Sequence, residues 1–359
     1  MKKGIVALLL LVILAAGAFF YFNRPKTGIN SIQVIGSHNS YKEYIDTPLF
    51  QLIKREDSNA VKGIEYTHMS LADQLTLGLR SLEIDVYADS KGGKYAHPAG
   101  LTWAGTNPAR PYDPKGLMNE PGFKVLHMQD IDFRSNCLTL KNCLNELKTW
   151  SDAHPDHEPI FITMNAKDDT MNRPGFVIPE RFTSATLNEL DNMISNNLGH
   201  KKLITPDMVK GNYETLEKAV LAGNWPKIDE AKGRFIFVLD EEGDKRQMYI
   251  QDHPSLKSRV LFVNAPEGTP ESAIIILNDP VKSLLQIQEL VKKGYIVRTR
   301  ADADTREARS NDTSRFMAAC KSGAQIISTD YYAKSSLFTS NYKISFDGGK
   351  YVRENPVVK

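Results

Sequence analysis

The stretch Ile35-Gly36-Ser37-His38-Asn39-Ser40-Tyr41 gives the clearest indication of the fold. It continues a β-prone run, Ser31–Ile35, so His38 and Asn39 stand where a strand gives way to a loop. Barrel enzymes present their chemistry from such positions. An imidazole titrates near neutral pH and can transfer protons, while an amide oxygen suits a divalent cation such as calcium or magnesium. A polar turn would contain the same dipeptide, so its meaning depends on the rest of the chain.

Apolar β-type runs alternate with helical runs after this stretch, which is typical of a parallel sheet wrapped by helices. Helical spacing of leucine and isoleucine indicates helices near residues 71–79, 140–147, 187–194 and 284–291. A ninth β-type run, Ala273–Leu277, competes with one of the eight candidate strands, Arg259–Val263. The eight candidates are Ser31–Ile35, Ser81–Tyr87, Lys124–Met128, Pro159–Met164, Arg234–Leu239, Arg259–Val263, Tyr295–Thr299 and Gln325–Thr329. We predict an α/β fold, a (β/α)8 TIM-type barrel.

The composition is that of an ordinary globular protein. The 359 residues are 41% hydrophobic and 25% charged, and the formal net charge is +2. This balance gives no reason to expect nucleic acid as a partner, and no protein partner is inferred. We expect residues 24–30 to form a linker and residues 31–359 to form a single barrel domain.

The N-terminal residues 1–23 differ from the rest of the chain. Lys2 and Lys3 precede an apolar run from Gly4 to Phe22, the layout of a signal peptide or an uncleaved membrane anchor. Both remain open, because small residues at 15–18 offer a cleavage site while 19–22 stay apolar. Lysines on the N-terminal side of the apolar run predict that the chain after the run lies outside the cytoplasm. We expect an extracytoplasmic protein that is secreted, periplasmic or anchored to the membrane.

Three cysteines suit an exported protein without requiring disulfides. Cys137 and Cys143 are close enough in sequence to form a bridge, which would leave Cys320 over. Whether this bridge forms stays open.

Glu83 and Asp85 lie in the run Ser81–Val86. Alternation along a strand places both carboxylates on one face and apolar residues on the other. Two carboxylates together in the mouth of a barrel are unfavourable unless a cation or a shared proton compensates. A metal site resolves this conflict, whereas on an exposed edge strand the two acids would simply be solvated.

His127 lies near the end of the candidate strand Lys124–Met128. With His38 it would give the pair that general acid–base cleavage of a phosphodiester needs, one group removing a proton and the other donating one. His97, in the long irregular segment 88–123, is the competing second histidine. The position on a strand favours His127.

Other polar residues follow the remaining strands. Asn165 and Lys167 share one face after the fourth, and a lysine there could meet a phosphate. Arg298 and Arg300 repeat this arrangement on the seventh strand, and Asp330 closes the eighth. The gathering of polar residues at strand carboxyl ends is the strongest physical indication of an active site, since barrels assemble theirs there.

These residues together resemble the calcium-dependent phosphoinositide-specific phospholipase C family of bacteria. The resemblance covers nearly all of the chain after the N-terminal run. It rests on six blocks in order, Gly36–Tyr41, Glu83–Val86, Gly122–His127, Trp150–Pro155, Val297–Asp302 and Ser322–Tyr332.

The resemblance implies a barrel phosphodiesterase in which His38 and His127 match the catalytic histidines. Asn39, Glu83 and Asp85 match the calcium ligands of the superfamily. In this chemistry the inositol 2-hydroxyl attacks the phosphorus of a phosphatidylinositol-type lipid, diacylglycerol leaves, and a cyclic inositol phosphate forms. Calcium would act as a Lewis acid on the attacking hydroxyl and the phosphate. The implied partners are a phosphoinositide or related diester and a membrane surface.

One position departs from the family pattern. Eukaryotic relatives place a glutamate ligand at the end of the fourth strand, where this chain has Asn165. An amide still supplies an oxygen but removes one charge, which predicts weaker calcium binding or a different ligand set. Two alternatives stay open, a glycerophosphodiester phosphodiesterase and a lipid- or sugar-phosphate-binding protein with weakened catalysis.

Overall fold

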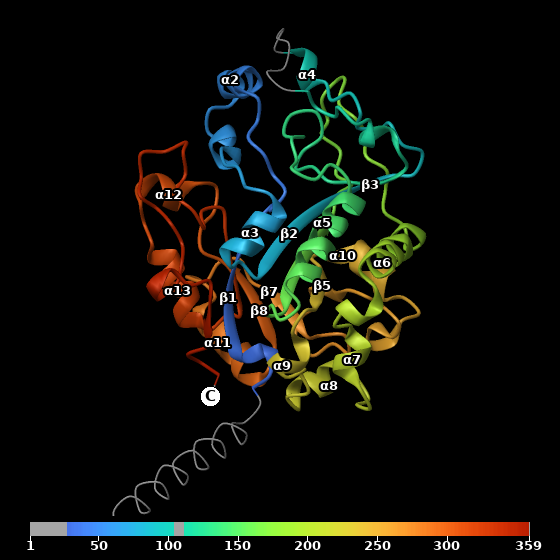
Figure 1. Cartoon of the computed structure of the whole chain (residues 1–359), viewed down its shortest axis with the longest axis vertical. Coiled ribbons are helices and arrows are strands. Elements are labelled where there is room, and N and C mark those ends of the chain that lie inside the picture. Colours follow the sequence, from blue (N-terminus) through green and yellow to red (C-terminus); the bar gives the residue numbers. More distant parts are fainter. Residues whose placement is uncertain (1–26, 104–110, 359) are drawn as a thin grey trace, which may run out of the picture.

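The computed structural model describes residues 27–103 and 111–358 (Figure 1). Residues 1–23, expected to be a signal peptide or membrane anchor, lie outside this part of the chain. Within the described residues, no helix is long and apolar enough to cross a membrane.

Eight parallel strands form the barrel that the sequence predicts. They are β1 (Ile32–Ser37), β2 (Ser81–Asp89), β4 (Ile160–Ala166), β5 (Phe235–Leu239), β6 (Phe262–Val263), β7 (Ile274–Ile276), β8 (Ile296–Arg300) and β9 (Ile326–Thr329). Their order across the sheet is β6-β5-β4-β2-β1-β9-β8-β7. A parallel bridge between Asn264 and Ile274 joins the two ends, so the sheet comes close to a full ring.

The expected strand Lys124–Met128 is wrong as a barrel strand. In its place β3 (Gly122–Lys124) pairs antiparallel with residues 87–89, where β2 projects beyond the barrel. Both β6 and β7 belong to the barrel, so the runs Arg259–Val263 and Ala273–Leu277 each contribute a strand instead of competing. Short apolar runs of similar length could not be ranked without knowing which of them pair in parallel.

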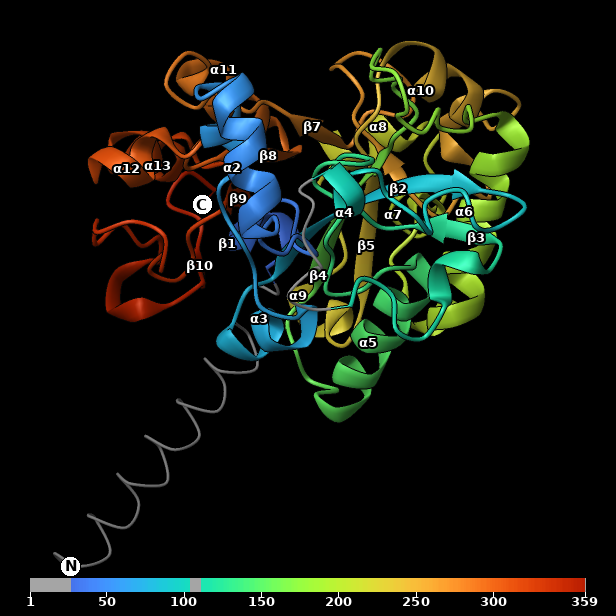
Figure 2. The same ribbon diagram turned by 90° about the horizontal axis from the view of Figure 1, so that it is seen from above.

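Helices cover the outside of the strands (Figures 1 and 2). The four predicted from leucine spacing are α3 (Leu71–Leu77), α5 (Leu140–Ala153), α6 (Ser184–Leu198) and α11 (Leu284–Lys293). Among the described residues, the other α-helices are α2 (Thr47–Glu56), α4 (Gly100–Trp103), α7 (Pro206–Lys210), α8 (Leu216–Leu221), α9 (Ile228–Ala231), α10 (Gly243–Ile250), α12 (Arg306–Ser310) and α13 (Ser314–Ser322). A last strand, β10 (Val352–Glu354), pairs antiparallel with β1. Gly78, Gly294 and Gly323 end α3, α11 and α13 in the left-handed conformation, which glycine adopts more readily than other residues.

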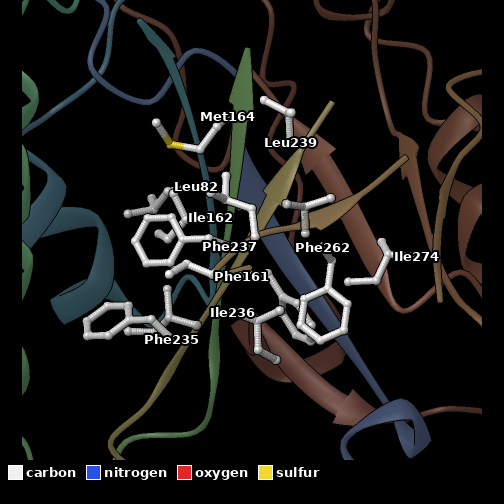
Figure 3. Close-up of a cluster of buried hydrophobic side chains, with 14 of the residues drawn as sticks. Leu82, Phe161, Ile162, Met164, Phe235, Ile236, Phe237, Leu239, Phe262 and Ile274 are labelled. Carbon is white, nitrogen blue, oxygen red and sulfur yellow. The ribbon is translucent and has the colours of Figure 1, made fainter. Parts of the chain in front are cut away.

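The core is built from strands that are buried on both faces. Side chains from β4, β5 and β6 interdigitate, among them Phe161, Ile162, Phe237 and Phe262 (Figure 3). All four are at most 1% exposed. Burial on both faces explains why these strands read as continuous apolar runs without clear alternation.

Gly36 allows β1 and β2 to approach closely where the end of β1 pairs with the start of β2. A Cβ at this position would lie 2.3 Å from the carbonyl oxygen of Ser81. Only glycine avoids this overlap, so the glycine before His38 sets how near the loop after β1 comes to β2.

Candidate active site

The residues singled out from the sequence come together at one rim of the barrel. The strands run in parallel, so their carboxyl ends meet there, below α2 and α4 in the upper part of Figure 1. Most of the predicted site residues lie on a barrel strand or just after one: His38 and Asn39 after β1, Glu83 and Asp85 in β2, Asn165 and Lys167 at the end of β4, Arg298 and Arg300 in β8, and Asp330 after β9. His127 is the exception, because it lies on the loop after β3.

His38 is held by a carboxylate through one ring nitrogen. Its Nδ1 lies 2.9 Å from Oδ1 of Asp330, and its Nε2 lies 3.7 Å from Oε1 of Glu83. A guanidinium nitrogen of Arg300 lies 3.1 Å from the second oxygen of Asp330. Burial opposes ionisation of Asp330, but His38 and Arg300 outweigh it and hold the pKa of this carboxyl well below its ordinary value. The imidazole therefore has a fixed ring with Nε2 directed toward the acidic residues of β2.

Two buried groups that the sequence reasoning missed support this pair. Asp302 accepts a hydrogen bond from the backbone nitrogen of Asp330 at 2.9 Å, and burial raises the pKa of Asp302. Nε2 of His68 lies 2.8 Å from the carbonyl oxygen of His38, and burial lowers the pKa of His68 to about 4. Because these contacts join distant segments, no local motif reveals them.

Glu83 and Asp85 share one face of β2, as alternation predicts. The amide nitrogen of Asn165 bridges them, 3.0 Å from Oε1 of Glu83 and 2.7 Å from Oδ1 of Asp85. The second oxygen of Glu83 pairs with Arg298, and Nζ of Lys167 lies 3.8 Å from Oδ2 of Asp85. Burial opposes ionisation of Glu83, but Arg298 outweighs it and lowers the pKa of this carboxyl. Both acids are therefore compensated by cationic neighbours.

Asn39 sits in a strained turn that is fastened to β2. Its φ of 47° is in the left-handed region, which asparagine tolerates better than most residues. Its amide nitrogen donates to the hydroxyl of Tyr66 at 2.7 Å. The neighbouring Ser40 donates its backbone N–H to the carbonyl of Glu83 at 2.9 Å and accepts from the Glu83 N–H at 2.7 Å. The amide oxygen is thus the atom that Asn39 would offer to a cation.

His127 has its own buried carboxylate partner. Nδ1 of His127 lies 2.7 Å from Oδ2 of Asp132. The other oxygen of Asp132 lies 3.2 Å from Nζ of Lys42, and the side chains of both Asp132 and Lys42 are fully buried. Met128 and Asp132 exchange two backbone hydrogen bonds of 3.0 Å, which closes a tight turn after His127. Neither Asp132 nor Lys42 was singled out from the sequence, although Asp132 lies only five residues after His127.

His97 is exposed, in contrast to His127. The expectation that His127 lies on a strand is wrong, because the chain leaves β3 at Lys124. The buried carboxylate of Asp132 nevertheless favours His127 over His97, since catalytic imidazoles need a fixed orientation.

The donor set fits a calcium ion by its chemistry. Calcium takes carboxylate and amide oxygens, and Asn39, Glu83, Asp85 and Asn165 offer both. The Asn165 amide already bridges the two carboxylates with its nitrogen, and turning it over would present its oxygen instead. Among the residues that the structure describes, no group of three or more His, Cys, Asp or Glu is arranged to hold a metal. The proposed ligand set contains two carboxylates and two amides.

Cations border the acidic pair on two sides. Arg298 and Arg300 come from β8 and Lys167 follows β4. Guanidinium and ammonium groups in such positions bind phosphate oxygens. Asp240 directly follows β5, and burial raises its pKa to about 6, so this carboxyl is partly protonated in mild acid.

His38 beside the Glu83–Asp85 pair, His127 on the loop after β3, and the fixed cations suit proton transfer during cleavage of a phosphate diester. The fold and the site thus place the chain among the phosphodiester hydrolases built on barrels. A family model described as phosphoinositide phospholipase C, Ca2+-dependent, matches residues 27–356, and the chain belongs to this family.

Solved structures agree with this assignment at the level of the fold. A calcium-dependent phosphoinositol-specific phospholipase C from Pseudomonas sp. is 16% identical, with a TM-score of 0.55 and coverage of 92% of this chain and 96% of that chain. A Ca2+-dependent phosphatidylinositol-specific phospholipase C from Streptomyces antibioticus is 18% identical, with a TM-score of 0.53 and coverage of 85% and 95%. No curated protein sequence matches the chain.

Proposed function

We propose that the protein is a calcium-dependent phospholipase C that cleaves phosphatidylinositol-type lipids through a cyclic inositol phosphate. One observation supports this proposal: His38 and His127 each contact their own buried aspartate, and both are joined to β2, His38 by its approach to Glu83 and His127 by the hydroxyl of Tyr87, which donates to its carbonyl oxygen at 3.2 Å. One histidine can serve as base and the other as acid in the same diester cleavage.

His38 is the proposed general base. Its Nε2 lies 3.7 Å from Glu83, so it is the histidine nearer to the proposed calcium ligands, where the attacking inositol 2-hydroxyl would bind. As Nε2 takes the hydroxyl proton, the imidazole becomes positively charged. The ionised Asp330 at Nδ1 stabilises that charge and keeps the tautomer that leaves Nε2 able to accept.

His127 is the proposed general acid. It enters the reaction protonated, with Nδ1–H directed to Asp132 and Nε2–H available for the oxygen of the leaving alcohol. The P–O bond to that oxygen breaks as the proton arrives, which leaves a neutral alcohol and the cyclic phosphate. A later reaction with water would reverse the roles of the two histidines.

The remaining polar residues would bind the ion and the phosphate. Asn39, Glu83, Asp85 and Asn165 are the proposed calcium ligands. Bound calcium supplies Lewis-acid chemistry, lowering the pKa of the attacking hydroxyl and offsetting phosphate charge.

The arginines and Lys167 would hold the phosphate oxygens. Arg300 contacts Asp330, and one of its guanidinium nitrogens lies 3.4 Å from Nε2 of His38. Arg298 and Lys167 approach the carboxylates of β2 from either side. These fixed cations are suited to the charge that develops on the phosphate during displacement.

An extracytoplasmic location is part of the proposal. The apolar N-terminal run would export or anchor the chain. A Cys137–Cys143 disulfide is present, which suits an oxidising compartment, while Cys320 is free and buried.

Phosphorus NMR of the products tests this function. The full chain in mixed micelles is incubated with phosphatidylinositol and, separately, with glycerophosphoinositol, each with calcium or with a chelator. The proposal expects a cyclic inositol phosphate signal from the lipid that appears only with calcium. Cleavage of glycerophosphoinositol alone would instead indicate a glycerophosphodiester phosphodiesterase, and no cleavage of either substrate would indicate a binding role.

A further inference from the structure

An apolar groove lies beside the loop that carries His127. It has a volume of about 190 Å³. Its walls come from four parts of the chain: Leu52 and Ile53 on α2, Ile64 on the turn 60–64, Trp103 on α4, and Met128 and Met171 on loops at the rim. Both α2 and α4 stand above the carboxyl ends of the strands (Figures 1 and 2).

The groove and the proposed acid share one turn of the chain. Met128 follows His127 directly, and Ile131 precedes Asp132, while Met128 and Asp132 are joined by backbone hydrogen bonds. This turn therefore places His127 and Asp132 in the candidate active site and lines the groove with Met128 and Ile131. The groove wall formed by Met128 and Ile131 is thus one residue away along the chain from both His127 and Asp132.

The lining suits an uncharged, apolar occupant. Charged residues of the lining are confined to Glu56, Asp57 and Arg173, and all three side chains are exposed at the edge. Glu56 and Arg173 pair with each other at 2.8 Å. Trp103 is 39% exposed, which is unusual for so large an apolar side chain. Exposed apolar surface rimmed by charges is typical of a binding site for an apolar group.

We propose that this groove binds an acyl chain of the leaving alcohol, so that the enzyme prefers a lipid to a water-soluble glycerol diester. The inference rests on the proposed function, because it assigns the leaving group to the His127 side. A recess next to the acid selects the chain of a single substrate molecule, whereas a membrane surface needs only protruding apolar side chains.

A chain-length series measures this selection. The full chain in phosphatidylcholine nanodiscs is assayed with inositol alkyl phosphodiesters from methyl to octyl. Each buried methylene contributes about 0.8 kcal/mol, so kcat/KM is expected to rise roughly fourfold per methylene until the groove is filled. Partition of the esters into the nanodiscs is the same for every variant. A difference between variants in how steeply kcat/KM rises with chain length is therefore due to the protein.

Variants of Leu52 distinguish a groove from a membrane contact. Leu52→Gln makes the wall polar, and Leu52→Trp keeps it apolar but fills the space. Both are expected to lower the octyl-to-methyl ratio of kcat/KM at least tenfold. Met171→Gln repeats the test from the other wall, and Ile178→Gln, at a 67% exposed apolar residue outside the groove lining, is the matched control.

The possible outcomes distinguish failure of the groove proposal from failure of the proposed function. A lower ratio in both Leu52 variants, with the control like the wild type, supports an acyl groove. A ratio that rises in Leu52→Trp would overturn it in favour of a membrane contact, and an unchanged ratio in every variant would overturn it outright. Cleavage of all esters without chain-length dependence would leave the proposed function intact but refute the groove. Failure of the wild type to cleave any ester would refute both.

Discussion

Replacing Asp132 with asparagine separates two functions of one buried carboxylate. In the structure Asp132 contacts His127 at 2.7 Å and Lys42 at 3.2 Å, and no part of the Asp132 or Lys42 side chain is exposed. Asp132→Asn leaves Lys42 buried without its anionic partner. Breaking a buried ion pair in this way destabilises a protein by about 3–5 kcal/mol. Lys42 keeps the carbonyl of Tyr66 at 3.0 Å, which favours the lower end of that range.

Activity is expected to fall independently of this stability loss. Asparagine can still accept a hydrogen bond from Nδ1 of His127 but cannot stabilise a protonated imidazole. Because a general acid contributes about 10²–10⁴-fold, we expect kcat to fall about 10²-fold, with an altered pH–rate profile. Urea unfolding measures the first effect, and the rate of lipid cleavage across pH measures the second.

The double variant Lys42→Met, Asp132→Asn tests whether Asp132 positions His127 or only stabilises the fold. Removing both charges restores most of the stability, since replacing a whole buried pair is often neutral. Activity is expected to stay near the level of Asp132→Asn, because His127 still lacks its carboxylate. If activity returned together with stability, Asp132 would be a counter-ion for Lys42 only, and the proposed support of His127 would be refuted.

Three further perturbations have defined outcomes. Asn165→Glu adds a third carboxylate to the proposed calcium ligands and is expected to lower the calcium concentration for half-maximal activity about tenfold, the equivalent of about 1.4 kcal/mol; an unchanged titration would remove Asn165 from the ligand set. Burial lowers the pKa of His68 from 6.5 to about 4. Between these two pH values only the unfolded chain binds the proton. The free energy of unfolding therefore decreases as the pH falls through this window, by at most about 1.4 kcal/mol per pH unit. His68→Gln should flatten this dependence in urea unfolding at pH 7 and pH 5, and an identical pH dependence in the variant would contradict the assignment. Serine at both Cys137 and Cys143 opens a short loop and should reduce the free energy of unfolding by about 2 kcal/mol; a urea midpoint equal to that of the wild type would show that the disulfide does not stabilise the fold.

The barrel was largely predictable because its signals are local. Alternating β-type and helical runs, helix-ending glycines and polar residues after strands each depend on neighbouring positions. Besides the unranked runs that became β6 and β7, one exception was the region around β3, where the run Lys124–Met128 resembles a barrel strand. Its pairing partner is the protruding end of β2, and no local pattern shows which strand extends beyond the barrel.

The site was predictable in its residue types but not in its supporting contacts. Glu83 and Asp85 share a face by alternation, which is readable from the sequence. Asn165 reaches them because β4 pairs directly with β2, and the expected barrel strand Lys124–Met128 would have stood between the two. The contacts of Lys42 with Asp132 and of Asp302 with Asp330 depend on how separate loops pack over the rim. Buried charges of this kind have no periodicity, so the structure was needed to find them.

The dependence on the leaving group tests the central assignment of His38 and His127 most directly. The full chain and its His38→Ala and His127→Ala variants are assayed with an inositol alkyl phosphodiester and with the nitrophenyl ester, whose phenolate departs without a proton. We predict that His127→Ala loses about 10²–10⁴-fold with the alkyl ester but little with the nitrophenyl ester, whereas His38→Ala loses activity with both. Equal losses on the two esters for His127→Ala, or full activity of either variant on the alkyl ester, would contradict the assignment.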